Sequence, residues 1–196
     1  MTYTEQTTYY FGSPGPENTD DAARFAVERA KNLGLSTIVV ASTTGSTALR
    51  FLEAMKGTNL SLVVVTHVFG FREPGVWDFS EDNAALLREK GARIVVGTHV
   101  LSGLERAISA NPKITGGSRT DAIAEALRRT VAIGMKVAVE CVLIAADQGA
   151  IGVEDEVLAV GGTGSGADTV CVILPANTVR YFDLQVREIV AMPRNR

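Results

Sequence analysis

The fold is decided by the stretch Ser36-Thr37-Ile38-Val39-Val40-Ala41-Ser42-Thr43-Thr44-Gly45-Ser46-Thr47-Ala48. Its first six residues are mostly β-branched or apolar, which predicts a strand buried on both faces of a sheet. Hydroxyl residues and one glycine follow, and residues 45–55 then show the apolar spacing of a helix. A buried strand that passes through a polar turn into a helix is typical of α/β proteins with a parallel sheet.

The alternation of helix and strand continues on both sides of this stretch. Further helices are predicted over residues 17–32, 81–90, 101–110 and 119–133, with Ser118 as the N-cap of the last one. Further strands are predicted over residues 60–66, 93–98, 156–160 and 169–174. Residues 135–146 fit either a long strand or a buried helix, and their length favours the helix.

The end of the chain looks less regular. Residues 187–190 resemble an edge strand, and residues 192–196 resemble a surface extension. No linker divides the chain, so we expect a single α/β domain over residues 1–196. Its predicted architecture is a three-layer αβα sandwich with a mainly parallel sheet of five or more strands.

Composition excludes several classes of protein. Hydrophobic residues make up 46% of the 196, enough for a full core, but no apolar run approaches the roughly 18 residues of a membrane-spanning helix. The net charge of −3 gives no basic face for a nucleic acid. Because the sequence shows no basic or apolar leader, we expect a cytoplasmic protein with no membrane partner. The sequence does not decide whether the protein forms a homo-oligomer. Cys141 and Cys171 lie in apolar runs and are expected to be buried hydrophobes rather than metal ligands.

Three predicted strands end in the same chemistry. Ser42, Thr43 and Thr44 follow the first strand, Thr66 and His67 end the second, and Thr98 and His99 end the third. Ligands of open α/β sheets bind outside the carboxyl ends of the strands. Hydroxyl residues also end strands and cap helices routinely, but three coincident endings favour a site.

The 42–47 loop is the strongest single signal for that site. Hydroxyls and a glycine at a helix start place backbone N–H groups, O–H donors and the positive helix end around one point, as phosphate binding requires. The loop lacks the Gly-Lys-Ser/Thr ending of a Walker motif, so NTP hydrolysis is disfavoured. We expect Thr44→Ala/Ser46→Ala, or a bulky residue at Gly45, to weaken a phosphorylated ligand with little change in thermal stability.

A second glycine-rich segment covers residues 161–168. Gly162, Gly164 and Ala167 imitate a dinucleotide fingerprint, but a strand pattern follows them where that fingerprint requires a helix. The segment is therefore predicted to be a hairpin or crossover loop, which either folds over a ligand or is a plain turn. Ser165 lacks the flanking glycines of a nucleophile elbow.

Other residues near the strand ends have two interpretations each. Phe69, Phe71 and Trp77, close to Gly70, can stack on a flat ring or plug the end of the domain. Arg106, near His99, can bind an anion or form an exposed salt bridge. Glu140 and Asp147 are expected to bond backbone amides or an arginine, although they share a helix face that can point into the site.

The hydroxyl loop, together with residues 156–166, resembles the C-terminal α/β domain of pyruvate kinase. More closely, the whole chain resembles small stand-alone proteins that are similar to this domain, through segments 15–19, 98–106, 117–120, 145–150 and 192–196. That resemblance implies FMN as a cofactor, with its phosphate on the 42–47 loop. The catalytic barrel of pyruvate kinase is missing from these 196 residues, so we do not expect pyruvate kinase activity.

Two hypotheses follow for function. The first is a binding protein for a phosphorylated small molecule, with FMN as the candidate. The second is an enzyme that uses the same pocket with a flavin or a phosphorylated metabolite and with His67 or His99 as acid or base. Neither histidine has an obvious carboxylate partner nearby in sequence. The candidate cofactor-binding residues are Ser42, Thr43, Thr44, Gly45, Ser46, Thr47, Thr66, His67, Gly70, Phe71, Thr98, His99, Gly162 and Gly164.

Overall fold

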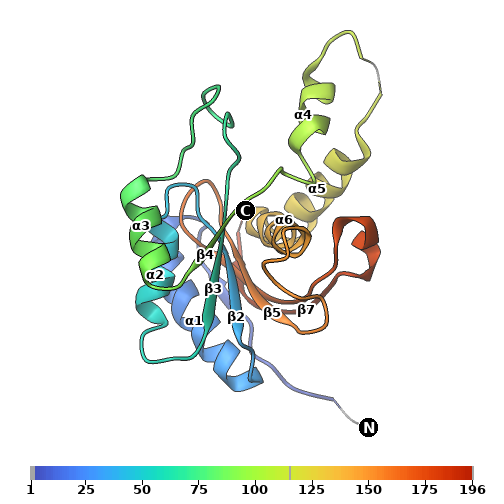
Figure 1. Cartoon of the computed structure of the whole chain (residues 1–196). Coiled ribbons are helices and arrows are strands. Elements are labelled where there is room, and N and C mark those ends of the chain that lie inside the picture. Colours follow the sequence, from blue (N-terminus) through green and yellow to red (C-terminus); the bar gives the residue numbers. More distant parts are fainter. Residues whose placement is uncertain (1–2, 115, 196) are drawn as a thin grey trace.

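The computed structural model describes residues 3–114 and 116–195 as a sheet with helices on both faces (Figure 1). The strands of the described residues are β1 (Tyr9–Phe11), β2 (Thr37–Ala41), β3 (Ser61–Thr66), β4 (Arg93–Val96), β5 (Val157–Gly161), β6 (Thr169–Leu174) and β7 (Gln185–Pro193). The helices are α1 (Thr19–Leu33), α2 (Ser46–Ala54), α3 (Glu81–Glu89), α4 (Gly103–Ala110), α5 (Arg119–Thr130) and α6 (Ile133–Asp147). Short 3₁₀ turns cover Pro16–Asn18 and Thr178–Asp183.

The sheet is mainly parallel, as the sequence predicted. Its strand order is β1-β7-β6-β5-β2-β3-β4. The pairs β5-β2, β2-β3, β3-β4 and β1-β7 are parallel, while β6 runs antiparallel to both of its neighbours. β3 lies beside β2, and β4 lies beyond β3 on the same side. The chain then crosses back, so that β5 lies on the other side of β2.

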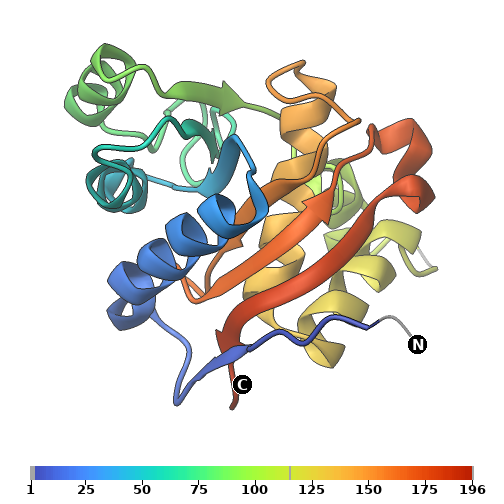
Figure 2. The ribbon, with the colours of Figure 1, turned by 90° about the horizontal axis from the view of Figure 1, so that it is seen from below.

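The alternation of side chains along β2 explains the three layers. Ile38 and Val40 point into the core shared with α1, α2 and α3, whereas Val39 points into the core shared with α6. Neighbouring strands repeat this division, because successive side chains of a strand point to opposite faces. Figure 2 shows α1 crossing one face of the sheet and α6 crossing the other. The three-layer αβα sandwich is therefore confirmed.

Residues 135–146 belong to the buried helix α6, which the sequence favoured over a strand. Most of its residues are buried against β2, β3, β5 and β6. The helix lies very close to β5, since a Cβ atom at Gly161 would be 2.1 Å from the backbone oxygen of Gly134. Glycine at position 161 lets the two backbones approach, while a Cβ atom at Gly134 would be 2.2 Å from the Thr169 hydroxyl of β6.

The strand predicted over residues 187–190 is present but is longer than expected. β7 runs from Gln185 to Pro193, and the short strand β1 pairs only with Ala191, Met192 and Pro193 and forms the edge there, whereas residues 187–190 pair with β6 alone (Figure 2). Met192 and Pro193 therefore belong to a strand and not to a surface extension. The sequence did not reveal β1, since three exposed or half-buried residues carry too little apolar alternation to indicate a strand.

Several predicted boundaries shift by a few residues. α1 begins at Thr19 because Pro16–Asn18 forms a separate 3₁₀ turn, and β4 ends at Val96 rather than at residue 98. α5 ends at Thr130, before α6 begins at Ile133. Ser118 caps α5 as predicted, accepting a 3.1 Å hydrogen bond from the amide of Asp121. Among the described residues, no helix combines the length and apolar character needed to cross a membrane.

Candidate functional site

A cleft of about 300 Å³ opens at the carboxyl ends of the parallel strands. Its walls are the 42–47 loop after β2, the end of β3 with the loop behind it, the segment from His99 to Arg106, one side of α6 and the 162–166 loop. The β3–α3 loop and the α4–α5 hairpin stand above the sheet on either side of this edge (Figure 1). The cleft lies near the neighbouring strands β2 and β5. The helix α2, which follows β2, covers one face of the sheet, and the helix α6, which precedes β5, covers the other. Ligands of open α/β sheets usually bind at such a point.

One wall is built from backbone amides and hydroxyls of the 42–47 loop. Ser42 is buried, and its Oγ accepts a 3.3 Å hydrogen bond from the amide of Ala48 in the first turn of α2. The hydroxyls of Thr44 and Ser46 lie 3.1 Å apart and are exposed. The amides of Ser46 and Thr47 have no acceptor within the described part of the chain. This wall therefore offers unused donors at the positive end of a helix.

The loop is held in place from behind by the start of α3. The Asn83 side-chain amide donates to the backbone oxygen of Thr44 at 2.9 Å, and the Ser80 amide donates to the same oxygen at 3.3 Å. Gly45 is the N-cap residue of α2 with φ +93°, and a Cβ there would lie 2.7 Å from Asn83 Cβ and 2.8 Å from Phe79 Cε1. The expectation that a bulky residue at Gly45 leaves stability nearly unchanged is therefore wrong, because it would be strained and would clash.

The second glycine loop joins antiparallel strands, so the hairpin is confirmed and the dinucleotide fingerprint is excluded. The loop is organised by Asp168, which is fully buried. Its carboxylate accepts hydrogen bonds from the amides of Gly15 (3.2 Å) and Thr163 (3.1 Å) and from the hydroxyl of Thr169 (2.9 Å). At Gly162, a Cβ would be 2.3 Å from the backbone oxygen of Gly166. The loop is thus a tightly folded edge of the cleft.

Both histidines reach the cleft and pack around Phe71. The ring centroid of Phe71 lies 3.9 Å from that of His67 and 4.9 Å from that of His99. His67 Nδ1 is 3.4 Å from the Asp78 carboxylate, a partner eleven residues away that the sequence pattern did not indicate. With its Nδ1 proton directed at Asp78, His67 presents Nε2 as an acceptor.

Burial keeps these histidines neutral at neutral pH. It lowers the pKa of His67 below its usual value, and the hydrogen bond to Asp78 offsets only part of this effect. Burial also lowers the pKa of His99 to about 4, against the attraction of the Glu140 carboxylate. The two rings lie 5.2 Å apart, so a charge on one would also oppose a charge on the other.

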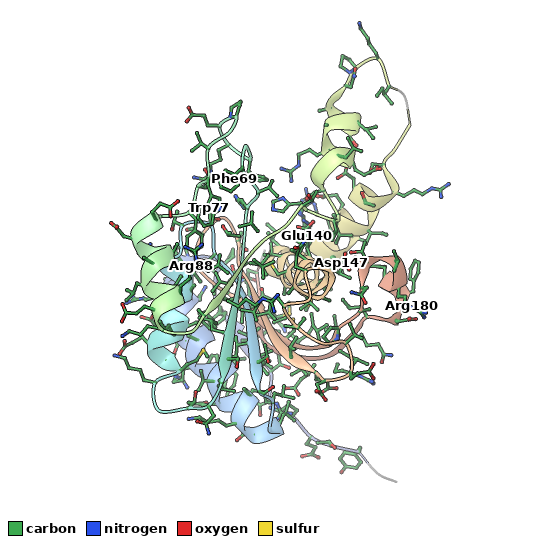
Figure 3. The ribbon with its side chains drawn as sticks, in the orientation of Figure 1. Phe69, Trp77, Arg88, Glu140, Asp147 and Arg180 are labelled. Atoms are coloured by element: carbon green, nitrogen blue, oxygen red, sulfur yellow. The ribbon has the colours of Figure 1, made fainter. Side chains whose placement is uncertain are left out.

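The opposite wall, on α6, carries a buried ion pair. Lys136 and Glu140 lie one helical turn apart, are 3% and 6% exposed, and form a short ammonium–carboxylate contact. Lys136 Nζ also donates to Ser102 Oγ at 3.3 Å, and Glu140 accepts from the amide of Leu101 at 2.8 Å. Burial lowers the pKa of Lys136, while Glu140 opposes that shift. Figure 3 shows Glu140 on the side of α6 turned toward the cleft.

Three arginines add positive charge at the rim. Arg72 comes from the β3–α3 loop, Arg106 from α4 and Arg128 from α5. Arg128 pairs with Glu125 at 2.6 Å and Arg72 lies 3.8 Å from Asp78. Arg106 lies over the Phe71 ring at 5.8 Å from its centroid and forms no ion pair with any residue that the structure describes. The rim is therefore suited to an anionic ligand.

Most predicted site residues come together in the cleft. Eleven of them line it, namely Ser42, Thr43, Thr44, Ser46, Thr47, Thr66, His67, Phe71, His99, Gly162 and Gly164. Gly45, Gly70 and Thr98 do not line it. Gly45 instead lies against Phe79, and Gly70 begins a short loop that its amide closes by a 2.9 Å hydrogen bond to the Val76 oxygen.

The structure also decides between the two interpretations that the sequence left for the neighbouring aromatic and acidic residues. Phe69 and Trp77 (Figure 3) stack on each other with centroids 5.6 Å apart and do not line the cleft, so of these three residues only Phe71 does. Glu140 bonds a backbone amide as expected but pairs with a lysine rather than an arginine. Asp147 accepts from the amide of Thr178 at 2.9 Å and is not part of the cleft.

Sequence reasoning missed Lys136, Ser102, Arg72 and Arg128. Lys136 stands in an apolar run where a single charge gives no motif, and Ser102 contacts it only through the fold. The one available signal was the spacing of Lys136 and Glu140, four residues apart on one helix face.

The layers, the strand order and the polar cleft at the strand ends define a three-layer α/β domain with its candidate site at the carboxyl edge of the sheet. Residues 20–173 match the family model described as pyruvate kinase, alpha/beta domain. The match covers more than half of the chain, which therefore belongs to that family. It extends from the first turn of α1 into β6 and includes every wall of the cleft.

Proposed function

We propose that this protein binds a phosphorylated small molecule in the cleft, with the phosphate on the 42–47 loop. The observation that carries the proposal is the pair of Ser46 and Thr47 amides, which have no acceptor among the described residues and belong to two residues that line the cleft. A phosphate at a helix start satisfies such amides and is favoured by the helix dipole. The exposed hydroxyls of Thr44 and Ser46 supply two further donors at the same point.

FMN is the ligand that we propose. Besides the polar 42–47 loop for the phosphate, the lining of the cleft includes the Phe71 ring and the apolar side chains Ile133 and Val137 of α6. An aromatic ring and aliphatic side chains suit a flat heterocycle, whose polar edges need a few fixed donors. FMN bound here would supply hydride and electron transfer. The residues of the chain would hold its phosphate and flank its ring.

Titration of wild-type protein with FMN and with riboflavin tests this proposal. Riboflavin has the same ring system but no phosphate. Charge-assisted hydrogen bonds contribute about 1.5–3 kcal/mol each, so we expect FMN to bind at least about tenfold more tightly. Quenching of flavin fluorescence measures both affinities. Equal affinities, or no binding of either compound, would contradict the proposal.

A second candidate function is an enzyme in which His67 acts as acid or base. It is favoured by the Asp78 contact, which orients the ring, and by the lowered pKa that leaves Nε2 unprotonated at neutral pH. In this function His67 would accept a proton from the reacting molecule at Nε2 and return it later. His67→Gln should then abolish turnover without abolishing binding. Equal turnover in that variant would exclude His67, and His99→Gln is the parallel test for the other ring.

A further inference from the structure

The Lys136–Glu140 pair is unusual for its position. α6 is otherwise apolar over most of its length and is buried against the sheet. Both side chains are more than nine-tenths buried, yet both belong to the wall of the cleft. A buried ion pair is often no more stabilising than apolar residues of similar volume, because both charges lose their hydration. Stability alone therefore gives a poor account of these two charges.

The hydrogen bonds of Lys136 leave one donor unused. Its ammonium group has three N–H bonds. One is directed to the Glu140 carboxylate and one to Ser102 Oγ. No third acceptor lies within reach among the residues that the structure describes. Because a buried ammonium without a full set of acceptors is costly, an oxygen atom in the cleft would complete the set.

The same contacts decide what kind of role Lys136 can have. Glu140 is fixed by the Leu101 amide and lies against the ammonium group, so it favours the charged form of the lysine. A charged lysine is a hydrogen-bond donor and not a nucleophile or a base. Ser102 is held by the same pair, since its hydroxyl donates to Glu140 and accepts from Lys136. The cluster is thus suited to binding.

We propose that Lys136 donates its third N–H to an acceptor oxygen of the ligand, at the end away from the phosphate. This inference rests on the proposed function and specifies the ligand further, as a phosphorylated molecule that also carries a carbonyl, imide or carboxylate oxygen. In FMN, this acceptor is a ring carbonyl. The phosphate loop then holds one end of the ligand, and Lys136 selects the other end by its chemistry.

The test uses Lys136→Met/Glu140→Gln, which removes both charges and leaves an acceptor for the Leu101 amide. Arg29→Met/Glu188→Gln is the matched control, since this partly buried pair at 2.6 Å joins α1 to β7 and does not line the cleft. The probes are FMN and phenyl phosphate, which has a phosphate and a ring but no carbonyl. We expect the cleft variant to lose about ten- to hundredfold in FMN affinity, with phenyl phosphate affinity unchanged. The control variant should bind both probes like the wild type.

Each outcome separates the two proposals. Wild-type FMN affinity in the cleft variant overturns the role of Lys136 and leaves the phosphate site intact. An equal loss for FMN and phenyl phosphate also overturns it, because Lys136 would then serve the phosphate or the shape of the cleft. A wild-type protein that binds neither probe overturns the proposed function, and the role of Lys136 with it.

Discussion

The two walls of the cleft face the same space with different chemistry. The 42–47 loop presents neutral hydroxyls and backbone amides, several of them exposed, at the start of a short helix. The α6 wall presents a buried charged pair on a helix that is otherwise mostly apolar. Neutral donors at a helix start can stay hydrated without a ligand, whereas buried charges depend on each other. The first wall can therefore change at little cost in stability, and the second cannot.

We call the 42–47 loop the neutral wall and the α6 side with Lys136 and Glu140 the charged wall. The largest effect is expected on the charged wall. Lys136→Met leaves the Glu140 carboxylate buried without its cation, which should cost about 3–5 kcal/mol of the free energy of unfolding. Lys136→Met/Glu140→Gln removes both charges and should recover most of that loss. Urea denaturation of the two variants and the wild type measures the difference. If Lys136→Met is as stable as the double variant, the pair is not energetically coupled and the comparison of the walls fails.

His99, which faces the charged wall, should make stability depend on pH. Its pKa of about 4 in the folded protein lies below the usual value of 6.5, so the unfolded chain binds the proton first as the pH falls. Wild type should therefore lose up to about 3 kcal/mol relative to His99→Gln between pH 6.5 and pH 4, and nothing above pH 7. Urea midpoints of both proteins across this range check the prediction. A constant difference would show that His99 titrates normally.

A smaller loss of stability is expected at Gly45, the residue of the 42–47 loop that is packed against α3 and Phe79. Gly45→Val forces a Cβ atom into a left-handed backbone position and against Phe79, so it should cost about 2–3 kcal/mol. Gly57→Val is the matched control, because Gly57 also has a positive φ of +74° but a Cβ atom there would meet no other atom within 4 Å. Thermal unfolding should show a clearly larger loss at Gly45. Equal losses would mean that backbone strain alone matters.

The difference between the walls also explains what the sequence revealed. The hydroxyl loop is contiguous, so residues 42–47 predicted both the fold and one wall of the cleft. The charged wall joins Lys136 to Ser102, 34 residues apart, and elsewhere in the cleft His67 contacts Asp78 across a loop. These contacts depend on tertiary packing and leave no local motif. β1 was missed for a related reason, since pairing with β7 rather than its own pattern makes it a strand.

The smallest effect on stability is expected for the hydroxyls of the neutral wall. Thr44→Ala/Ser46→Ala removes two exposed hydroxyls that bond each other, and Gly45 rather than either of them is the N-cap of α2. It should change the free energy of unfolding by less than about 0.5 kcal/mol. Ser118→Ala/Thr120→Ala, at the start of α5, should cost about 1 kcal/mol, because Ser118 caps its helix. Chemical denaturation of both variants measures the two losses. A larger loss for Thr44→Ala/Ser46→Ala than for Ser118→Ala/Thr120→Ala would show that the 42–47 hydroxyls stabilise the fold.

The most direct test of the phosphate site is the affinity of these same two variants for FMN and riboflavin. Thr44→Ala/Ser46→Ala should bind FMN at least about tenfold more weakly than wild type and riboflavin equally well, because only the phosphate loses its donors. Ser118→Ala/Thr120→Ala, whose residues do not line the cleft, should bind both compounds like wild type. Unaltered FMN affinity in Thr44→Ala/Ser46→Ala would contradict the assignment of the phosphate to the 42–47 loop.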